Sequence, residues 1–287
     1  MRLRVLGSGG NTPIPTPTCT CSVCDQARRA GPPFARGGNS LYVPELSAMI
    51  DAPEFAFRAL NRERITDLSY IFLTHWHPDH VNGLRVVQSR DFSAHDGLLE
   101  AIGSAQPTLV TTEAVYERIC DVFGQIEHFT DQGFATVLFI DDSPLEIAGW
   151  TVRSIPYPLS GDDPDATAFV IEDEDTTVLV ASDDARYLDE AALPADIDLA
   201  IFECGLFETC PDGEQLFTDA DWDFLADELT HREVLERIER LDPAMTLLTE
   251  IEHLTARGYD HFQSLEQEDA YNGIRFAYDG LTLEVGN

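Results

Sequence analysis

The sequence predicts an α/β protein, because short apolar runs typical of strands alternate along the chain with segments of helical periodicity. Helical patterns cover residues 54–62, 113–123 and 221–240. Between residues 136 and 180 the strand-like runs follow one another closely, which indicates an antiparallel sheet in the second half of the chain. The expected strands cover residues 3–6, 40–43, 47–51, 68–73, 108–110, 136–139, 145–147, 151–155, 167–172, 177–180, 199–204 and 245–248.

The loops at the ends of the first strands carry two signals. The strand at 3–6 ends in the glycine-rich segment 7–10, which no Gly-Lys-Ser/Thr follows, so a close approach of two backbones is favoured over a phosphate site. The runs 40–43 and 47–51 indicate a hairpin that ends in Asp51. For Asp51, orienting a metal ligand and simply forming a turn both stay open.

A metal-binding motif is the strongest functional signal in the sequence. It has the spacing His-x-His-x-Asp-His, directly after the apolar run 68–73, and its residues are His75, His77, Asp79 and His80. Imidazole nitrogens and carboxylate oxygens are the usual donors for borderline divalent metals. Side chains alternate along an extended backbone, so His75 and His77 point the same way. Asp79 and His80 lie beyond the strand and can reach a second ion. Asp183, after the run 177–180, is a further predicted ligand.

A second metal site is predicted in the loop that follows the glycine-rich segment. Three cysteines there have the spacing Cys-x-Cys-x2-Cys, at Cys19, Cys21 and Cys24. Three thiols at this spacing can surround one tetrahedral ion, and a fourth ligand must come from elsewhere in the chain. We therefore expect a structural zinc site.

The composition restricts the partners and the compartment. The chain has 52 acidic and 18 basic residues, a net charge of −34, and all of the basic residues are arginine. This lysine-free, acidic composition resembles that of proteins from salt-loving archaea, in which concentrated salt screens the repulsion. We expect a cytoplasmic protein that acts on a small molecule and binds neither DNA nor a membrane; a homodimer stays open.

The motifs occur in an order that resembles a known family. The segments concerned are 6–10, 19–24, 50–51, 75–80, 181–183 and 249–253. They resemble the phosphoribosyl cyclic phosphodiesterase family of bacterial phosphonate breakdown, which has the metallo-β-lactamase fold. The resemblance implies a four-layer αββα sandwich, two catalytic metal ions and a zinc ion held by three cysteines and one histidine. It also implies a single domain over 1–287, with halves of roughly 1–133 and 134–287 and a zinc loop near 17–38. His253 is implied as the fourth zinc ligand.

The chain departs from the family pattern at three positions. The family's last catalytic histidine is Glu250 here, and its middle histidine falls at 160–161. Its histidine before the late helix falls on Glu228, and His231 follows three residues later as a replacement. One ion could be bound by Asp79, His80, Asp183 and Glu250, an oxygen-rich ligand set that favours Mn²⁺ over Zn²⁺. The other ion could be bound by His75, His77 and Asp183, and it needs water or one of the loop aspartates Asp162, Asp163 and Asp165 as a further ligand.

These features lead to the hypothesis of a metal-dependent hydrolase acting on a small phosphodiester, such as a cyclic sugar phosphate. Asp79 and Asp183 would hold the attacking water, and either Glu228 or His231 would serve the leaving oxygen. Arg36 is a candidate phosphate contact. Hydrolysis of lactones or thioesters stays open, as does a fold retained for binding without catalysis.

Overall fold

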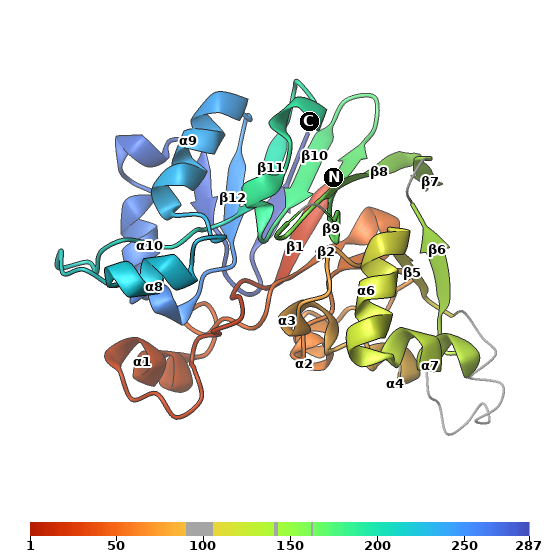
Figure 1. Ribbon diagram of the computed structural model, residues 1–287, viewed down its shortest axis with the longest axis horizontal. Helices are drawn as coiled ribbons and strands as arrows, with labels where there is room; N and C mark the ends of the chain where they lie inside the picture. Colours follow the sequence, from red (N-terminus) through yellow and green to blue (C-terminus); the bar gives the residue numbers. More distant parts are fainter. Residues whose placement is uncertain (90–105, 141–142, 162, 287) are drawn as a thin grey trace.

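The protein is a four-layer αββα sandwich, as the family resemblance implied. The structure is a computed structural model that describes residues 1–89, 106–140, 143–161 and 163–286. Within these described ranges, two mixed seven-stranded sheets lie face to face, and helices cover the outer face of each sheet (Figure 1). The side chains between the sheets form one continuous apolar core.

The first sheet is built from the first half of the chain and the last strand. The neighbouring strands from β14 through β1 and β2 to β3 pair antiparallel. The neighbouring strands from β3 through β4 and β5 to β6 pair parallel. The order in space is β14 (Thr282–Glu284), β1 (Arg2–Gly7), β2 (Ser40–Val43), β3 (Ala48–Ile50), β4 (Tyr70–Phe72), β5 (Thr108–Thr111) and β6 (Thr136–Phe139).

The second sheet begins with antiparallel pairs from β7 to β10 and continues with parallel pairs from β10 to β13. Parallel strands have their carboxyl ends at one edge of the sheet, and this edge later forms part of the site. The order in space is β13 (Ile274–Phe276), β12 (Thr246–Thr249), β11 (Leu199–Glu203), β10 (Thr177–Ala181), β9 (Ala166–Glu172), β8 (Trp150–Tyr157) and β7 (Leu145–Ile147).

The helices pack their apolar faces on the two outer surfaces. The first sheet is covered by α2 (Ala56–Arg62), α3 (Pro78–Val81), α4 (Val86–Ser89), α6 (Glu113–Phe123) and α7 (Gln125–Asp131). The second is covered by α9 (His231–Leu241) and α10 (Tyr259–Leu265), with α8 (Asp219–Phe224) beside them. The helix α1 (Ser22–Ala30) lies at the periphery (Figure 1). Among the described residues, no helix is long and apolar enough to cross a membrane.

The aromatic pair Phe72 and Phe169 joins the two sheets at the centre of the core. The ring centroids are 5.2 Å apart with an edge-to-face angle of 76°, and both side chains are almost fully buried. Burying a phenylalanine side chain stabilises a fold by about 1.5–3 kcal/mol. Because Phe72 ends β4 and Phe169 lies in β9, this contact fixes the metal-motif loop relative to the second sheet.

Three sequence predictions about the fold were wrong in detail. The run at 136–139 forms β6, which pairs parallel with β5 in the first sheet and not with the second-half strands. The run at 245–248 is not the last strand, because β13 and β14 follow. The helical pattern at 221–240 is split into α8 and α9, since Thr218 and Thr230 each form a capping box that begins a new helix.

The glycine-rich loop after β1 makes the close approach that its sequence favoured. A β-carbon on Gly7 would lie 1.9 Å from the carbonyl oxygen of Gly38, and one on Gly10 would lie 2.1 Å from Glu250 Oε2. Glycine is therefore required at position 7 by the backbone contact, and at position 10 it leaves room for the Glu250 carboxylate.

We expect Gly7→Ala to destabilise the protein by at least about 1–3 kcal/mol, because the clash is with backbone that cannot rotate away. Gly258→Ala is the matched control, since a β-carbon there would have no neighbour nearer than 3.7 Å. Urea unfolding in molar salt measures both variants. Equal midpoints for the two would contradict the close approach.

Candidate functional site

The candidate site lies where the carboxyl ends of parallel strands from both sheets face one cavity of about 450 Å³. The loop after β4 carries the histidine motif, and it is held between the sheets by two backbone hydrogen bonds. Leu73 N donates to Val110 O at 2.9 Å, and Thr167 N donates to Thr74 O at 2.8 Å. The acidic side chains that line the cavity are Asp79, Asp183, Asp184, Glu203, Glu228, Glu250 and Glu252.

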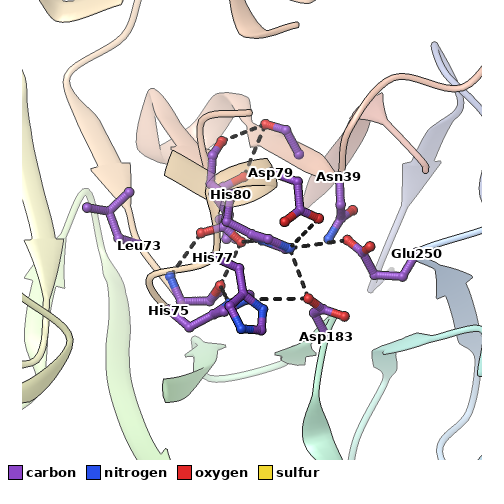
Figure 2. A network of polar contacts seen from close by, with 12 residues as sticks. Asn39, Leu73, His75, His77, Asp79, His80, Asp183 and Glu250 are labelled. Atoms are coloured by element: carbon purple, nitrogen blue, oxygen red, sulfur yellow. Dashed lines mark hydrogen bonds and ion pairs between the residues drawn. The ribbon is translucent and has the colours of Figure 1, made fainter. Parts of the chain in front are cut away.

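Two neighbouring groups of side chains could each hold a metal ion. In each group the donor atoms lie within 4.8 Å of one another; one is formed by His75, His77, Asp183 and Asp184, the other by Asp79, His80 and Glu250. Asp183 Oδ2 is 3.4 Å from His75 Nε2 and 3.0 Å from His80 Nε2, so this carboxylate lies between the groups (Figure 2). A bridging position is therefore available to Asp183.

Three buried donor atoms in these groups indicate that they are arranged for a ligand. His75 Nε2, His80 Nε2 and Glu250 Oε1 have no hydrogen-bonding partner among the described residues. Buried polar atoms in folded proteins are rarely left in this state, because each lost hydrogen bond with water costs free energy. Divalent cations fit this donor set, which combines imidazole nitrogen with carboxylate oxygen.

Asp51 orients the histidine motif from beneath the cavity. Its carboxylate accepts from Thr74 N at 2.9 Å and from Thr74 Oγ1 at 2.7 Å, and it lies 2.8 Å from His80 Nδ1. With Nδ1–H donating to Asp51, the lone pair of His80 Nε2 points to the cavity. Burial would lower the pKa of His80, but Asp79 and Asp51 raise it well above its usual value. The ligand-orienting interpretation of Asp51 therefore fits its contacts.

The first donor group also contains Asp184, which was not predicted from the sequence. Asp184 Oδ2 lies 3.0 Å from His77 Nδ1. Asp184 has a positive φ of 47°, which turns its carboxylate to the same cavity as Asp183. Of the loop aspartates, Asp165 accepts from Leu159 N at 3.0 Å, and Asp163 is exposed. Asp162 lies outside the described residues. The signal for Asp184 was the Asp-Asp pair after a buried strand.

The remaining acidic side chains form one wall of the cavity. Burial is the main cause that raises the pKa of Glu228 to about 8, with Asp184 and Asp183 adding to it. Burial also raises the pKa of Glu252 to about 7 and holds the pKa values of Glu203 and Glu250 well above the usual range. Glu228 thus faces the cavity as predicted, whereas Glu203 and Glu252 were not identified from the sequence.

Two predicted site residues lie elsewhere. His231 lies 2.6 Å from Cys204 O through Nδ1 and 3.0 Å from the Tyr271 hydroxyl through Nε2, and its ring stacks on Phe207. Arg36 is 2% exposed and donates to Ser8 Oγ at 3.0 Å and to Ala277 O. Neither side chain lines the cavity. The predicted acid–base role of His231 and the predicted phosphate contact of Arg36 are therefore wrong. Both side chains instead make buried hydrogen bonds within the fold.

The thiol cluster forms around His253, at the end of the chain segment that follows β12. His253 Nε2 lies 3.5 Å from Cys19 Sγ and 3.2 Å from Cys21 Sγ, and Cys24 Sγ completes a group within 4.8 Å. Tetrahedral zinc with ordinary Zn–S and Zn–N bonds would place sulfur and nitrogen about 3.6 Å apart. The fold therefore assembles a donor set that fits zinc, with the predicted members.

Comparisons with known proteins agree with this fold. A family model described as a beta-lactamase superfamily domain matches residues 44–251. A crystal structure of a diphosphatase from the PhnP family is similar with a TM-score of 0.69 and 23% identity, over 99% of this chain and 97% of that one. Zn²⁺-bound PqqB from Methylobacterium extorquens has a TM-score of 0.69 and 16% identity, over 99% and 100%. Human tRNase Z, short form, has a TM-score of 0.57 and 14% identity, over the whole of both chains. No curated protein matches the chain.

We expect Cys21→Ser to lower the zinc content from about one ion per chain to nearly none, because thiolates dominate zinc binding in such sites. Cys210→Ser is the control, since Cys210 lies outside the cluster. Metal analysis after purification under reducing conditions measures both. Unchanged zinc in the first variant would show that these thiols do not hold the ion.

The metal-free cavity should lose stability as pH rises from about 5 to 8, because carboxyl groups with raised pKa bind protons in the folded state that the unfolded state has released. His80 acts in the same direction, since its raised pKa also favours the protonated folded state. Thermal unfolding in molar salt with a weak chelator should show this slope, and excess Mn²⁺ should remove it. Glu228→Gln should flatten part of it; a slope of opposite sign would contradict the burial of these groups.

Proposed function

Because the chain belongs to the beta-lactamase superfamily, we propose that it is a metal-dependent hydrolase whose substrate is a small phosphodiester, such as a cyclic sugar phosphate. The observation that supports this most directly is the pair of adjacent donor groups that share Asp183 and open to one cavity. A pair of divalent ions held there would polarise an ester oxygen and lower the pKa of a bound water.

The donor groups differ in their content of carboxylates. The first has two imidazoles with Asp183 and Asp184, and the second has one imidazole, His80, with Asp79, Glu250 and the shared Asp183. Oxygen-rich sets suit harder ions, so the second group favours Mn²⁺ over Zn²⁺. Asp79 and Asp183 would orient a water molecule between the groups.

Glu228 is our candidate for the proton donor to the leaving oxygen. Its side chain is partly buried, lines the cavity, and has a pKa raised to about 8 by burial and by Asp184 and Asp183. A carboxyl group that stays protonated near neutral pH can donate a proton in the reaction. His231 does not reach the cavity, so this role rests on Glu228 alone.

A second candidate function is hydrolysis of a neutral ester, such as a lactone or thioester. It is favoured by the cavity wall, because none of its described lining residues is arginine and the chain contains no lysine. A phosphodiester would therefore rely on the metal ions for charge neutralisation. A fold that binds a ligand without catalysis is the remaining alternative.

The proposal is tested by turnover of bis-p-nitrophenyl phosphate and p-nitrophenyl acetate in molar salt, with Zn²⁺, Mn²⁺ and Ni²⁺ in turn. We expect hydrolysis of the diester, fastest with Mn²⁺, and loss of at least about 100-fold in Asp183→Asn. Turnover of the acetate alone would favour the neutral-ester function. Folded, metal-loaded protein with neither activity would leave only the binding function.

Glu250→His should shift metal preference from Mn²⁺ toward Zn²⁺ by about 10-fold, because an imidazole replaces a hard, charged donor. Competition between the two ions for the protein, followed by metal analysis, measures this independently of activity. Glu236→His is the control, since Glu236 is an exposed residue of α9. An unchanged ratio in Glu250→His would mean that Glu250 does not ligate an ion.

A further inference from the structure

The turn that follows β10 brings two consecutive carboxylates to the same cavity. Successive side chains of a strand point to opposite faces of its sheet, so Asp183 and Asp184 could not both face one site if β10 continued. Asp184 has a φ of 47° and a ψ of 36°, the left-handed conformation, and both side chains line the cavity. We call residues 183–186 the aspartate turn. Its backbone conformation decides whether the first donor group contains two carboxylates.

Side chains from three other elements hold the backbone of the aspartate turn. The left-handed conformation is unfavourable for a residue with a side chain, and it persists where surrounding groups fix the backbone. Within the turn, Ala185 N donates to Glu203 Oε1 at 2.9 Å from β11. The carbonyl oxygens of Asp183, Ala185 and Arg186 accept from side chains of β8 and α9. Four backbone groups of one short turn are therefore bound by side chains distant in the sequence.

Tyr157 holds the aspartate turn from β8. Its hydroxyl donates to Asp183 O at 2.8 Å, and the residue is 3% exposed. Tyr157 pairs with Ala166 of β9, and Ala166 also forms a β-bridge with His75 of the histidine motif. The tyrosine thus connects the turn to the part of the second sheet that contacts the motif. Tyr157 is not among the described residues that line the cavity, so it acts on the backbone of a donor residue.

Arg237 holds the same turn from α9. Its guanidinium group donates to Ala185 O at 2.7 Å and to Arg186 O at 3.3 Å, and it pairs with Glu190 at 3.1 Å. Arg237 is buried, and burial of a guanidinium group costs free energy unless its donors find partners. Its planar group presents several N–H donors in a fixed geometry, which suits two successive carbonyls of a turn. Arg237 is also absent from the described lining of the cavity.

We propose that Tyr157 and Arg237 are positioning residues of the metal site, which hold the aspartate turn so that Asp183 and Asp184 both reach the donor groups. The inference rests on the proposed function, because it requires these groups to bind divalent ions. The first group contains both carboxylates of the turn, whereas the second has only the shared Asp183. A loosened turn should therefore weaken the binding of one ion more than that of the other.

Tyr157→Phe tests the inference, because it removes the hydroxyl and keeps the buried ring. Calorimetric titration with Mn²⁺ in molar salt, after treatment with a weak chelator, should show one of two affinities reduced about 10-fold and the other reduced less. Tyr42→Phe is the matched control: Tyr42 is 5% exposed, and its hydroxyl donates to Asp67 O at 2.7 Å outside the cavity. It should lower the urea midpoint to a similar extent and leave both affinities unchanged. Unchanged Mn²⁺ affinities in Tyr157→Phe would overturn the inference.

Two further variants show whether the effect passes through the aspartate turn. Arg237→Met should also weaken Mn²⁺ binding, whereas Arg240→Met should not, since Arg240 is exposed and pairs with the same Glu190 at 2.6 Å. In an Asp184→Asn background, the effect of Tyr157→Phe should fall to about 3-fold or less, because one of the carboxylates that the turn positions no longer binds. A full 10-fold effect of Tyr157→Phe in that background would show that the hydroxyl acts elsewhere, and would overturn the inference.

Turnover of bis-p-nitrophenyl phosphate separates this inference from the proposed function. Lower turnover by Tyr157→Phe at limiting Mn²⁺, with kcat restored at saturating Mn²⁺, would support both. Diester turnover with normal Mn²⁺ affinities in the variant would reject the inference and keep the function. Weakened Mn²⁺ binding in the variant, with no turnover even by the unchanged protein, would support the inference and reject the function.

Discussion

The partly buried carboxylate of Asp183, shared between two groups of metal donors, is the constraint on which the rest of the site depends. It lies 3.0 Å from His80 Nε2 and 3.4 Å from His75 Nε2. Burial opposes its charge, but the neighbouring His75 and His80 hold its pKa well below the usual range. A carboxylate charge held among other acidic residues favours compensating cations at this position.

The two sheets are both needed to create this arrangement. The first sheet supplies the histidine motif after β4, and the second supplies Asp183 after β10 and Glu250 after β12. The edge-to-face contact of Phe72 and Phe169 keeps the two contributions in register. A shift of one sheet on the other would separate the donors, so packing of the core between the sheets is also a condition for metal binding.

An excess of acidic residues is a property of the site as well as of the surface. The net charge of −34 is spread along the chain, and the cavity contains carboxylates beyond those that metal ions would balance. On the surface, concentrated salt would screen such repulsion, because the screening length falls to about 3 Å at 1 M. Inside the cavity, burial raises the pKa of Glu228 to about 8 and that of Glu252 to about 7, so proton binding reduces the charge there.

The sequence by itself determined the fold class, the histidine motif and the thiol cluster, because each depends on local spacing or on donors with few alternative roles. It could not decide which strands neighbour one another, as β6 shows by pairing with β5. Nor could it place single polar residues. Asp184 reaches His77 only because of a left-handed backbone turn, while His231 and Arg36 are taken up by buried hydrogen bonds. Such contacts join residues distant in the chain, and only tertiary packing decides them.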